Sequence, residues 1–254
     1  MDSLTINRYE IANNCFARSS ASRNINFLIL HHLQANSIDE TIEALEKYEV
    51  SAHFLIDKNG KIAQLVEEND VAFHAGVSYW NGVDGINQHS IGIEFINSNP
   101  FTNNFSKQQM IAGIELISYL INKYQILPRY ILGHSDIAYH RQSGLLDRKQ
   151  DPSHLFDWQY LAQHNIGLYP YQNLNDEILL FEYGIISNEI ALIKQKLQKF
   201  GYKLSAINDN FDEEMRMLTR VFNRHFNNNI DIRSQDLWLY SSNSALNQLI
   251  TMIS

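Results

Sequence analysis

Short apolar runs alternate with amphipathic stretches over the first two thirds of the chain, a pattern typical of an α/β fold. Each apolar run is short enough to form a buried strand. A turn over residues 57–60, which ends in glycine, predicts a hairpin that continues over 61–66. The predicted buried strands cover residues 26–30, 52–56, 90–96 and 130–133.

Helices are predicted between these strands. Ser37 and Glu40 form a capping-box pattern at the start of a short helix, and Ser106 caps a longer one whose apolar residues recur at helical spacing. The polar segments 1–24 and 71–88 are expected to be loop-like. The predicted helices of this part cover residues 41–48, 106–124 and 158–163. The expected fold class is therefore α/β, with a mixed central β-sheet flanked by helices.

The composition changes near residues 167–175, where Pro170 and two asparagines mark a linker. Beyond this point the apolar pattern is helical only, which predicts a small all-α three-helix domain. Its helices are expected over residues 186–200, 213–226 and 244–253. The predicted division is a domain over 1–168, a linker over 169–175 and a helical domain over 176–254.

Composition and charge restrict the classes of function. Hydrophobic residues make up 44% of the chain, enough to bury a sizeable core without disulfides. The formal net charge of −8 argues against a nucleic-acid partner, whose phosphates require lysine and arginine. The one cysteine, Cys15, excludes a disulfide within the chain and an all-cysteine zinc site. No apolar run is long enough for a membrane span or for the core of a signal peptide.

Two predicted strands are followed directly by histidine, His31 and His134. Imidazoles at a sheet rim can point into one cleft and bind a divalent cation, and a catalytic zinc site needs one further protein ligand. The alternative is that each histidine is an ordinary polar residue at a strand end. Spacing alone does not decide between these readings. The candidates for a third ligand are Asp136, Asp147, Asp151 and His154.

Six segments, in this order along the chain, resemble the zinc-dependent N-acetylmuramoyl-L-alanine amidases, a family related in fold to peptidoglycan recognition proteins. The resemblance covers residues 23–165. The segments are Leu28-Ile-Leu-His31, Ser51-Ala-His-Phe-Leu-Ile56, Phe73-His-Ala-Gly-Val-Ser-Tyr-Trp80, Ser90-Ile-Gly-Ile-Glu94, Gly133-His-Ser-Asp-Ile137 and Lys149-Gln-Asp-Pro-Ser-His-Leu-Phe-Asp-Trp158.

The resemblance implies a role for each matching residue. His31, His134 and Asp151 would be the ligands of a zinc cofactor, with Asp151 preferred to Asp136. Glu94 matches the acidic catalytic residue of the family, which exchanges protons with water and with the leaving amine. Lys149 matches a residue that stabilises the transition state, where positive charge meets the developing oxyanion.

Other residues of the matching segments are expected near the substrate. His53, His74 and Trp80 are predicted to be substrate-binding residues. Packing is an equal alternative for His53 and Trp80, and His53 could instead orient a metal ligand. His32 should point away from the metal, because successive strand residues face opposite sides of a sheet.

The chain departs from the family pattern around the site. Leu33 stands where members usually have threonine, and Phe73 where they have tryptophan. Ser153-His154 replaces a common Gly-Pro pair, and residues 141–148 resemble an insertion. These changes leave the preference for a particular substrate less defined than the reaction.

The reaction implied by the resemblance is hydrolysis of the amide between N-acetylmuramic acid, or its anhydro form, and L-alanine in peptidoglycan or muropeptides. This activity belongs to bacterial cell-wall degradation or muropeptide recycling. The alternatives are a non-catalytic peptidoglycan-recognition module and a zinc peptidase that cuts within the stem peptide. The helices from residue 176 resemble a small peptidoglycan-binding domain, with a purely structural helical module as the alternative.

The expected partner is therefore a peptidoglycan or muropeptide substrate, without nucleic acid, a membrane span or an obligate protein partner. The substrate favours the cell envelope or periplasm. The cytoplasm is the alternative, because no export signal is evident in the sequence.

Overall fold

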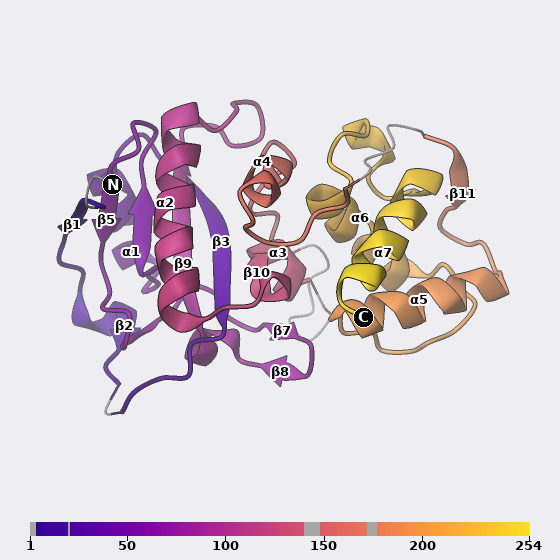
Figure 1. Cartoon of the computed structure of the whole chain (residues 1–254), viewed down its shortest axis with the longest axis horizontal. Helices are drawn as coiled ribbons and strands as arrows, with labels where there is room; N and C mark the ends of the chain where they lie inside the picture. The colour runs from indigo at the N-terminus through magenta and orange to yellow at the C-terminus, as the bar shows by residue number, and fades with distance from the viewer. Residues whose placement is uncertain (1–3, 20, 140–147, 172–176) are drawn as a thin grey trace. The chain divides into compact units, whose positions relative to one another are not determined.

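The structure is a computed structural model that describes residues 4–19, 21–139, 148–171 and 177–254 (Figure 1). The chain divides into two compact units. The first comprises Met1–Gly76, Gly85–His134 and Asp151–Gly167, and the second comprises Val77–Asp84, Ser135–Gln150 and Leu168–Ser254. The predicted domain limits stay a prediction, and residues 172–175 of the predicted linker lie outside the described residues, as do 141–147 of the predicted insertion.

In the part of the chain that the structure describes, six strands form the main sheet of the first unit, in the order β1-β5-β4-β9-β3-β10. Neighbouring strands are parallel except β4 and β5, which are antiparallel. This arrangement confirms the predicted mixed sheet. The strands are β1 (Ile6–Arg8), β3 (Phe27–Gln34), β4 (Phe54–Ile56), β5 (Ile62–Gln64), β9 (Ser90–Asn97) and β10 (Ile131–Gly133).

The centre of this sheet is the parallel pair β3 and β9, which are in register from Phe27 opposite Ser90 to Gln34 opposite Asn97. β9 is buried along its whole length, as expected for a strand covered on both faces. β3 is longer than predicted and continues past His31. His31 therefore lies inside a strand, where it is paired with Glu94 of β9.

Helices cover both faces of the sheet. α1 (Ile38–Lys47) packs on the face that carries Leu55, and α2 (Lys107–Tyr124) packs on the opposite face, where Gly113 lies close to the ring of Phe95 (Figure 1). Both predicted N-caps are present. The hydroxyl of Ser37 accepts a hydrogen bond from the Glu40 amide, and that of Ser106 accepts one from the Gln109 amide, each at 3.1 Å. The closing helix α4 (Trp158–Gln163) has its predicted bounds.

The expectation that segments 1–24 and 71–88 contain only loops is wrong. They hold several short elements, among them β1 and the antiparallel pairs β2–β6 and β7–β8. Two or three residues are too few to show an apolar period, and these strands form because partners are available. The elements are η1 (Asn13–Cys15), β2 (Phe16–Ala17), β6 (Val71–Ala72), β7 (Tyr79–Trp80), β8 (Val83–Asp84) and η2 (Ile86–His89).

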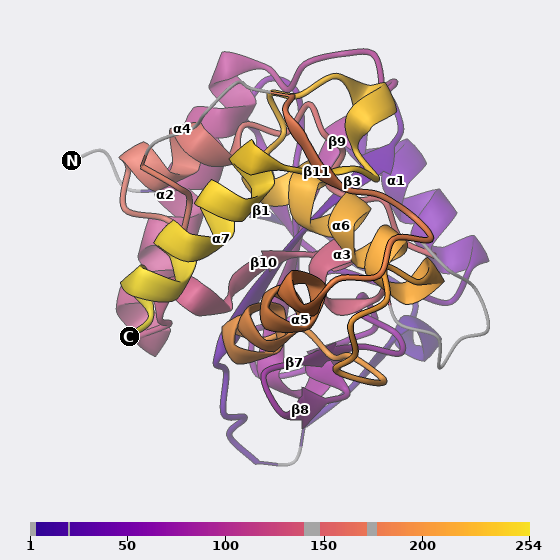
Figure 2. The same cartoon turned by 90° about the vertical axis from the view of Figure 1, so that its right-hand side faces the viewer.

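The second unit contains the three predicted C-terminal helices, which Figure 2 shows with β11. α6 (Glu213–Phe226) has its predicted bounds, whereas α7 (Tyr240–Met252) begins four residues earlier than expected. The unit also holds two short strands that the helical pattern did not predict, β11 (Leu179–Phe181) and β12 (Trp238–Leu239), which pair with each other. The other elements within the described residues are η3 (Pro128–Tyr130), α3 (His134–Ile137), α5 (Asn188–Phe200) and η5 (Ile232–Ser234). Within the described ranges, no helix has the length and apolar character needed to cross a membrane.

Candidate functional site

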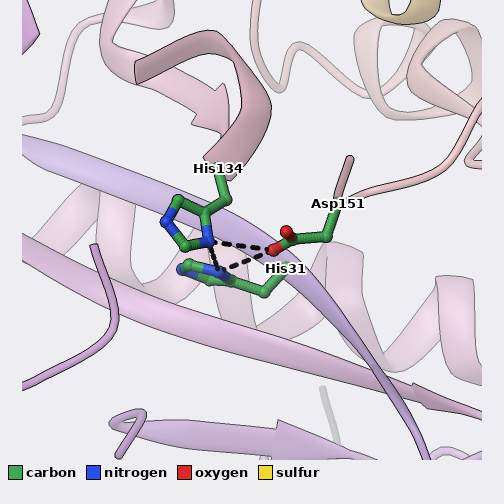
Figure 3. A group of neighbouring side chains, drawn as sticks. All are labelled: His31, His134 and Asp151. Carbon is green, nitrogen blue, oxygen red and sulfur yellow. Dashed lines mark hydrogen bonds and ion pairs between the residues drawn. The ribbon is translucent and has the colours of Figure 1, made fainter. Parts of the chain in front are cut away.

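Three side chains from distant parts of the sequence converge in the first unit (Figure 3). Nδ1 of His31 lies 3.1 Å from Nδ1 of His134 and 3.0 Å from Oδ2 of Asp151. Nδ1 of His134 lies 3.1 Å from the same carboxylate oxygen. His31 is 103 residues from His134 and 120 from Asp151, so the fold alone brings them together.

The strand arrangement explains how the two histidines meet. β3 and β10 are neighbouring parallel strands, with Leu30 opposite Gly133. Each of these residues is followed by a histidine, His31 within β3 and His134 directly after β10, so the two imidazoles lie side by side. Both are almost fully buried, with exposed fractions of 1% and 3%.

The carboxyl group of Asp151 is held in its ionised form. Burial by itself favours the neutral acid, but His134 and His31 outweigh it and keep the pKa of Asp151 well below its usual range. An ionised carboxylate is the form that binds a metal ion.

The donor set fits a divalent cation. Bonds of about 2.0–2.1 Å to a tetrahedral zinc place neighbouring donor atoms about 3.3 Å apart. The three donors here form a nearly equilateral triangle with sides of 3.0, 3.1 and 3.1 Å. Two imidazoles and one carboxylate match a catalytic zinc site, in which the fourth position stays available. Within the described ranges, this is the one group of three such residues close enough to share an ion.

Glu94 lies beside this group. It is opposite His31 in the register of β3 and β9, and its Oε1 is 3.9 Å from Nδ1 of His31. Its side chain is largely buried but keeps a small exposed fraction of 9%. The carboxylate is therefore close to the three donors without belonging to the same triangle.

The opposite edges of both imidazoles contact one short segment, His74-Ala75. Nε2 of His31 is 3.0 Å from Nδ1 of His74, and Nε2 of His134 is 3.1 Å from the carbonyl oxygen of Ala75. Nε2 of His74 in turn lies 3.0 Å from the hydroxyl of Ser90. Burial, together with the neighbouring histidines, holds the pKa of His74 well below its usual value. Thus His74, predicted to bind substrate, directly contacts a candidate metal ligand.

His53 and Trp80 occupy packed positions without exposed surface. Nδ1 of His53 accepts a hydrogen bond from the Gly92 amide and its Nε2–H donates to the carbonyl of Asp70, both at 3.1 Å. Burial lowers the pKa of His53 to about 3. Trp80, in the second unit, packs edge-on against Tyr202. Their predicted roles in substrate binding stay predictions that this packing does not support.

Asp136, the rival for the third ligand position, has other partners within the second unit. Its Oδ2 lies 2.6 Å from Nδ1 of His225, and its Oδ1 accepts a hydrogen bond from the hydroxyl of Tyr202 at 3.1 Å. Asp136 is not a member of the group of three donors. Another candidate, Asp147, lies outside the described residues.

The structure places the two remaining predicted residues as follows. Nδ1 of His32 accepts a hydrogen bond from the Ser153 amide at 3.0 Å, and its ring packs against Phe101, which confirms that it points away from the three donors. Lys149 belongs to the second unit and is half-buried, so its role stays a prediction from the sequence match.

Two residues that contact this site were given no role from the sequence, although Ser90 opens one of the six family-like segments. Ser90 is one small polar residue at the start of a strand, and Asn87 lies in a polar stretch that was expected to be a loop. Asn87 Oδ1 accepts hydrogen bonds from the amides of His74 and Ala75, at 3.1 and 2.7 Å. Only contacts across the fold identify them.

Comparisons with known proteins identify relatives of this chain. AmiD of Escherichia coli, an N-acetylmuramoyl-L-alanine amidase, is 32% identical over 216 residues, which cover 80% of this chain and 75% of AmiD. The 1,6-anhydro-N-acetylmuramyl-L-alanine amidase AmpD of Haemophilus influenzae is 42% identical over 117 residues, which cover 44% of this chain and 58% of AmpD.

Solved structures show the same relationship. The structure of E. coli AmiD in complex with the substrate anhydro-N-acetylmuramic acid-L-Ala-D-gamma-Glu-L-Lys superposes with a TM-score of 0.73 and 29% identity, covering 92% of this chain and 91% of that one. AmpDh3 of Pseudomonas aeruginosa also gives a TM-score of 0.73, at 26% identity, covering 95% and 98%. The model of the N-acetylmuramoyl-L-alanine amidase family matches residues 21–154, which include His31, Glu94, His134 and Asp151. The chain belongs to the N-acetylmuramoyl-L-alanine amidase family.

Proposed function

We infer that this protein is a zinc-dependent amidase that hydrolyses the bond between N-acetylmuramic acid, or its anhydro form, and L-alanine in peptidoglycan or muropeptides. The observation that carries this function is the triangle of donor atoms formed by His31, His134 and Asp151. Family membership and the relatives AmiD and AmpD support the amide as the bond cleaved.

The donor residues would hold zinc, and Glu94 would move protons. Zinc, when bound, supplies a Lewis acid that polarises the amide carbonyl and lowers the pKa of water to about 7. Glu94 lies close enough to the donors to accept a proton from the attacking water, with its Oε1 3.9 Å from Nδ1 of His31. The same carboxyl group would then return the proton to the leaving amine of L-alanine. The burial of Glu94 limits its contact with bulk water.

Lys149 is proposed to stabilise the oxyanion, on the strength of its match to the family pattern two residues before Asp151. The substrate class is proposed from the relatives. AmiD is described with a bound anhydro-N-acetylmuramic acid peptide, and AmpD is described as a 1,6-anhydro-N-acetylmuramyl-L-alanine amidase. We therefore propose anhydro-muropeptides as the first substrates to test.

Product analysis tests this function against both alternatives. Zinc-loaded protein would be incubated with an anhydro-muropeptide and, in parallel, with intact sacculi, and the products analysed by mass spectrometry. An amidase releases a peptide with a free N-terminal L-alanine and leaves the amino sugar with its lactyl carboxylate.

A peptidase would leave L-alanine attached to the lactyl group, and a recognition module would bind the muropeptide without any product. Either result would overturn the proposed function. A chelator should stop the release of the peptide with a free N-terminal L-alanine, and added zinc should restore it. Both results would support the zinc requirement. The ratio of products from the two substrates would show whether the intact wall or its released fragments are preferred.

A further inference from the structure

The positions of the protons on His31 and His74 can be deduced from one backbone carbonyl. The hydroxyl of Ser90 donates its single hydrogen to the carbonyl oxygen of Ile86, at 2.8 Å. Ser90 Oγ therefore accepts the hydrogen bond from His74, whose Nε2 lies 3.0 Å away and must carry the proton.

The chain of donors and acceptors continues to the metal site. A neutral imidazole with hydrogen on Nε2 has a lone pair on Nδ1, so Nδ1 of His74 is an acceptor. Its partner at 3.0 Å, Nε2 of His31, must therefore be the donor. His31 is left with a lone pair on Nδ1, the atom that faces His134 and Asp151.

The backbone carbonyl of Ala75, the residue after His74, fixes the position of the proton on the second candidate ligand, His134. A carbonyl oxygen accepts and cannot donate, so Nε2 of His134 donates to Ala75, at 3.1 Å. His134 in its neutral form therefore also carries a lone pair on Nδ1.

The segment that makes both contacts is itself held in place. The side chain of Asn87 accepts hydrogen bonds from the amides of His74 and Ala75. The guanidinium of Arg23 donates to the carbonyl oxygens of Asn87 and Ser90, at 2.8 and 2.7 Å. One largely buried hydrogen-bonded network thus supports both candidate zinc ligands on the side opposite their Nδ1 atoms.

We propose that His74 and Ser90 are positioning residues, which act through Nε2 of His31 to direct its Nδ1 lone pair at the metal, while Ala75 does the same for His134. The inference rests on the proposed function, because it concerns the zinc ligands. It gives His74 a role in metal binding in place of its predicted contact with substrate. Groups that orient a metal-binding histidine typically contribute 10- to 100-fold, as an order of magnitude, to metal affinity.

Two pairs of variants of the full chain test this role. His74→Asn retains an acceptor near the position of Nδ1, whereas His74→Leu has none. Ser90→Ala removes the hydroxyl group at the far end of this series of hydrogen bonds. Ser51→Ala is its matched control. Ser51 is as buried as Ser90, and its hydroxyl likewise donates to a carbonyl, that of Cys15, at 2.7 Å. It accepts from the Phe73 amide at 3.0 Å, without a contact to either ligand histidine.

The readouts are zinc affinity, from competition with a chromogenic chelator, and the tautomer of His31 in zinc-loaded protein, from long-range ¹H–¹⁵N spectra. We expect His74→Leu to weaken zinc binding by about 10- to 100-fold and Ser90→Ala by a smaller factor. His74→Asn should recover most of the affinity lost in His74→Leu. Ser51→Ala should lower thermal stability without changing zinc affinity. The spectra should show hydrogen on Nε2 of His31 in the wild type and a weakened or lost signal in His74→Leu.

Equal zinc affinity in His74→Leu, Ser90→Ala and the wild type would overturn the positioning role while leaving the amidase function intact. Equal losses of zinc affinity in Ser90→Ala and Ser51→Ala would also overturn the positioning role, because zinc affinity would then depend on protein stability alone. Failure of the wild type to bind zinc would instead overturn the proposed function.

Discussion

His31 and Glu94 are partners in the register of the parallel strands β3 and β9, and Nδ1 of His31 lies 3.9 Å from Oε1 of Glu94. Adjacent residues of neighbouring strands project from the same face of the sheet, so a candidate ligand and a candidate proton carrier are fixed side by side by backbone pairing. The arrangement does not depend on a flexible loop. It predicts that metal binding and proton transfer can be separated by substitution.

Replacement of Glu94 by glutamine should preserve zinc binding and reduce turnover. Glutamine keeps the size of the side chain but cannot exchange a proton, and the loss of a general acid–base group typically lowers the rate by about 10² to 10⁴. Zinc content measured after dialysis, together with kcat on an anhydro-muropeptide, would check this. Full activity in Glu94→Gln would remove Glu94 from the mechanism.

Replacement of Asp151 by alanine should abolish tight zinc binding, because two imidazoles remain as protein ligands of the group. Asp157→Ala is the control. Asp157 caps α4 by accepting a hydrogen bond from the Tyr160 amide at 2.9 Å. Its replacement should lower the stability by about 1 kcal/mol and leave the zinc content unchanged. Elemental analysis of the purified proteins gives the metal content. Stoichiometric zinc in Asp151→Ala would identify a different third ligand.

A methyl group at Gly92 should disturb the site through His74. A Cβ atom at Gly92 would lie 2.5 Å from Cγ of His74, so the imidazole would have to shift and its contact with His31 would be disturbed. Overpacking of this kind costs roughly 1–3 kcal/mol of stability. We expect Gly92→Ala to lose zinc affinity as well as stability, measured by chelator competition and thermal unfolding.

Gly113→Ala is the control for this substitution. Its Cβ would also meet an aromatic ring, that of Phe95 at 2.8 Å, on the face of the sheet covered by α2. Its zinc affinity should stay at the wild-type level despite a similar loss of stability. Equal zinc affinities in both variants would show that the packing of Gly92 on His74 does not influence the metal site.

Stability of the zinc-free protein should fall on acidification, partly through His53. Burial lowers the pKa of His53 to about 3, below the 6.5 expected for the unfolded chain, so between these values the unfolded state binds more protons. The contribution of His53 to the free energy of unfolding is therefore complete above about pH 6.5, and it is lost progressively as the pH falls toward 3. One additional proton bound by the unfolded state lowers the free energy of unfolding by about 1.4 kcal/mol for each unit that the pH falls.

Denaturant unfolding between about pH 7 and pH 4 would measure this slope in the wild type and in His53→Gln. Glutamine has no titrating group in this range, so the variant should show a shallower dependence of unfolding free energy on pH. Parallel curves for the two proteins would contradict the assignment of the proton uptake to His53.

Local patterns in the sequence predicted much of the scaffold. Hydroxyl caps at Ser37 and Ser106, together with apolar spacing, placed helices α1 and α2, because capping and amphipathicity depend on residues within a turn or two. The buried strands were recognised from their short apolar runs. The strands missed were two or three residues long, such as β1 and β2, whose formation depends on partners elsewhere in the chain.

The sequence by itself determined the family, the mixed sheet and the residue types available for chemistry. The order of six family-like segments carries that information without coordinates. Only the tertiary structure decided that His31, His134 and Asp151 meet, and that Asp136 instead contacts His225. It also decided that His74 contacts His31. The physical reason is that a metal site and a tautomer depend on distances and hydrogen bonds between side chains. Here the partners are up to 120 residues apart, beyond the range of any local pattern.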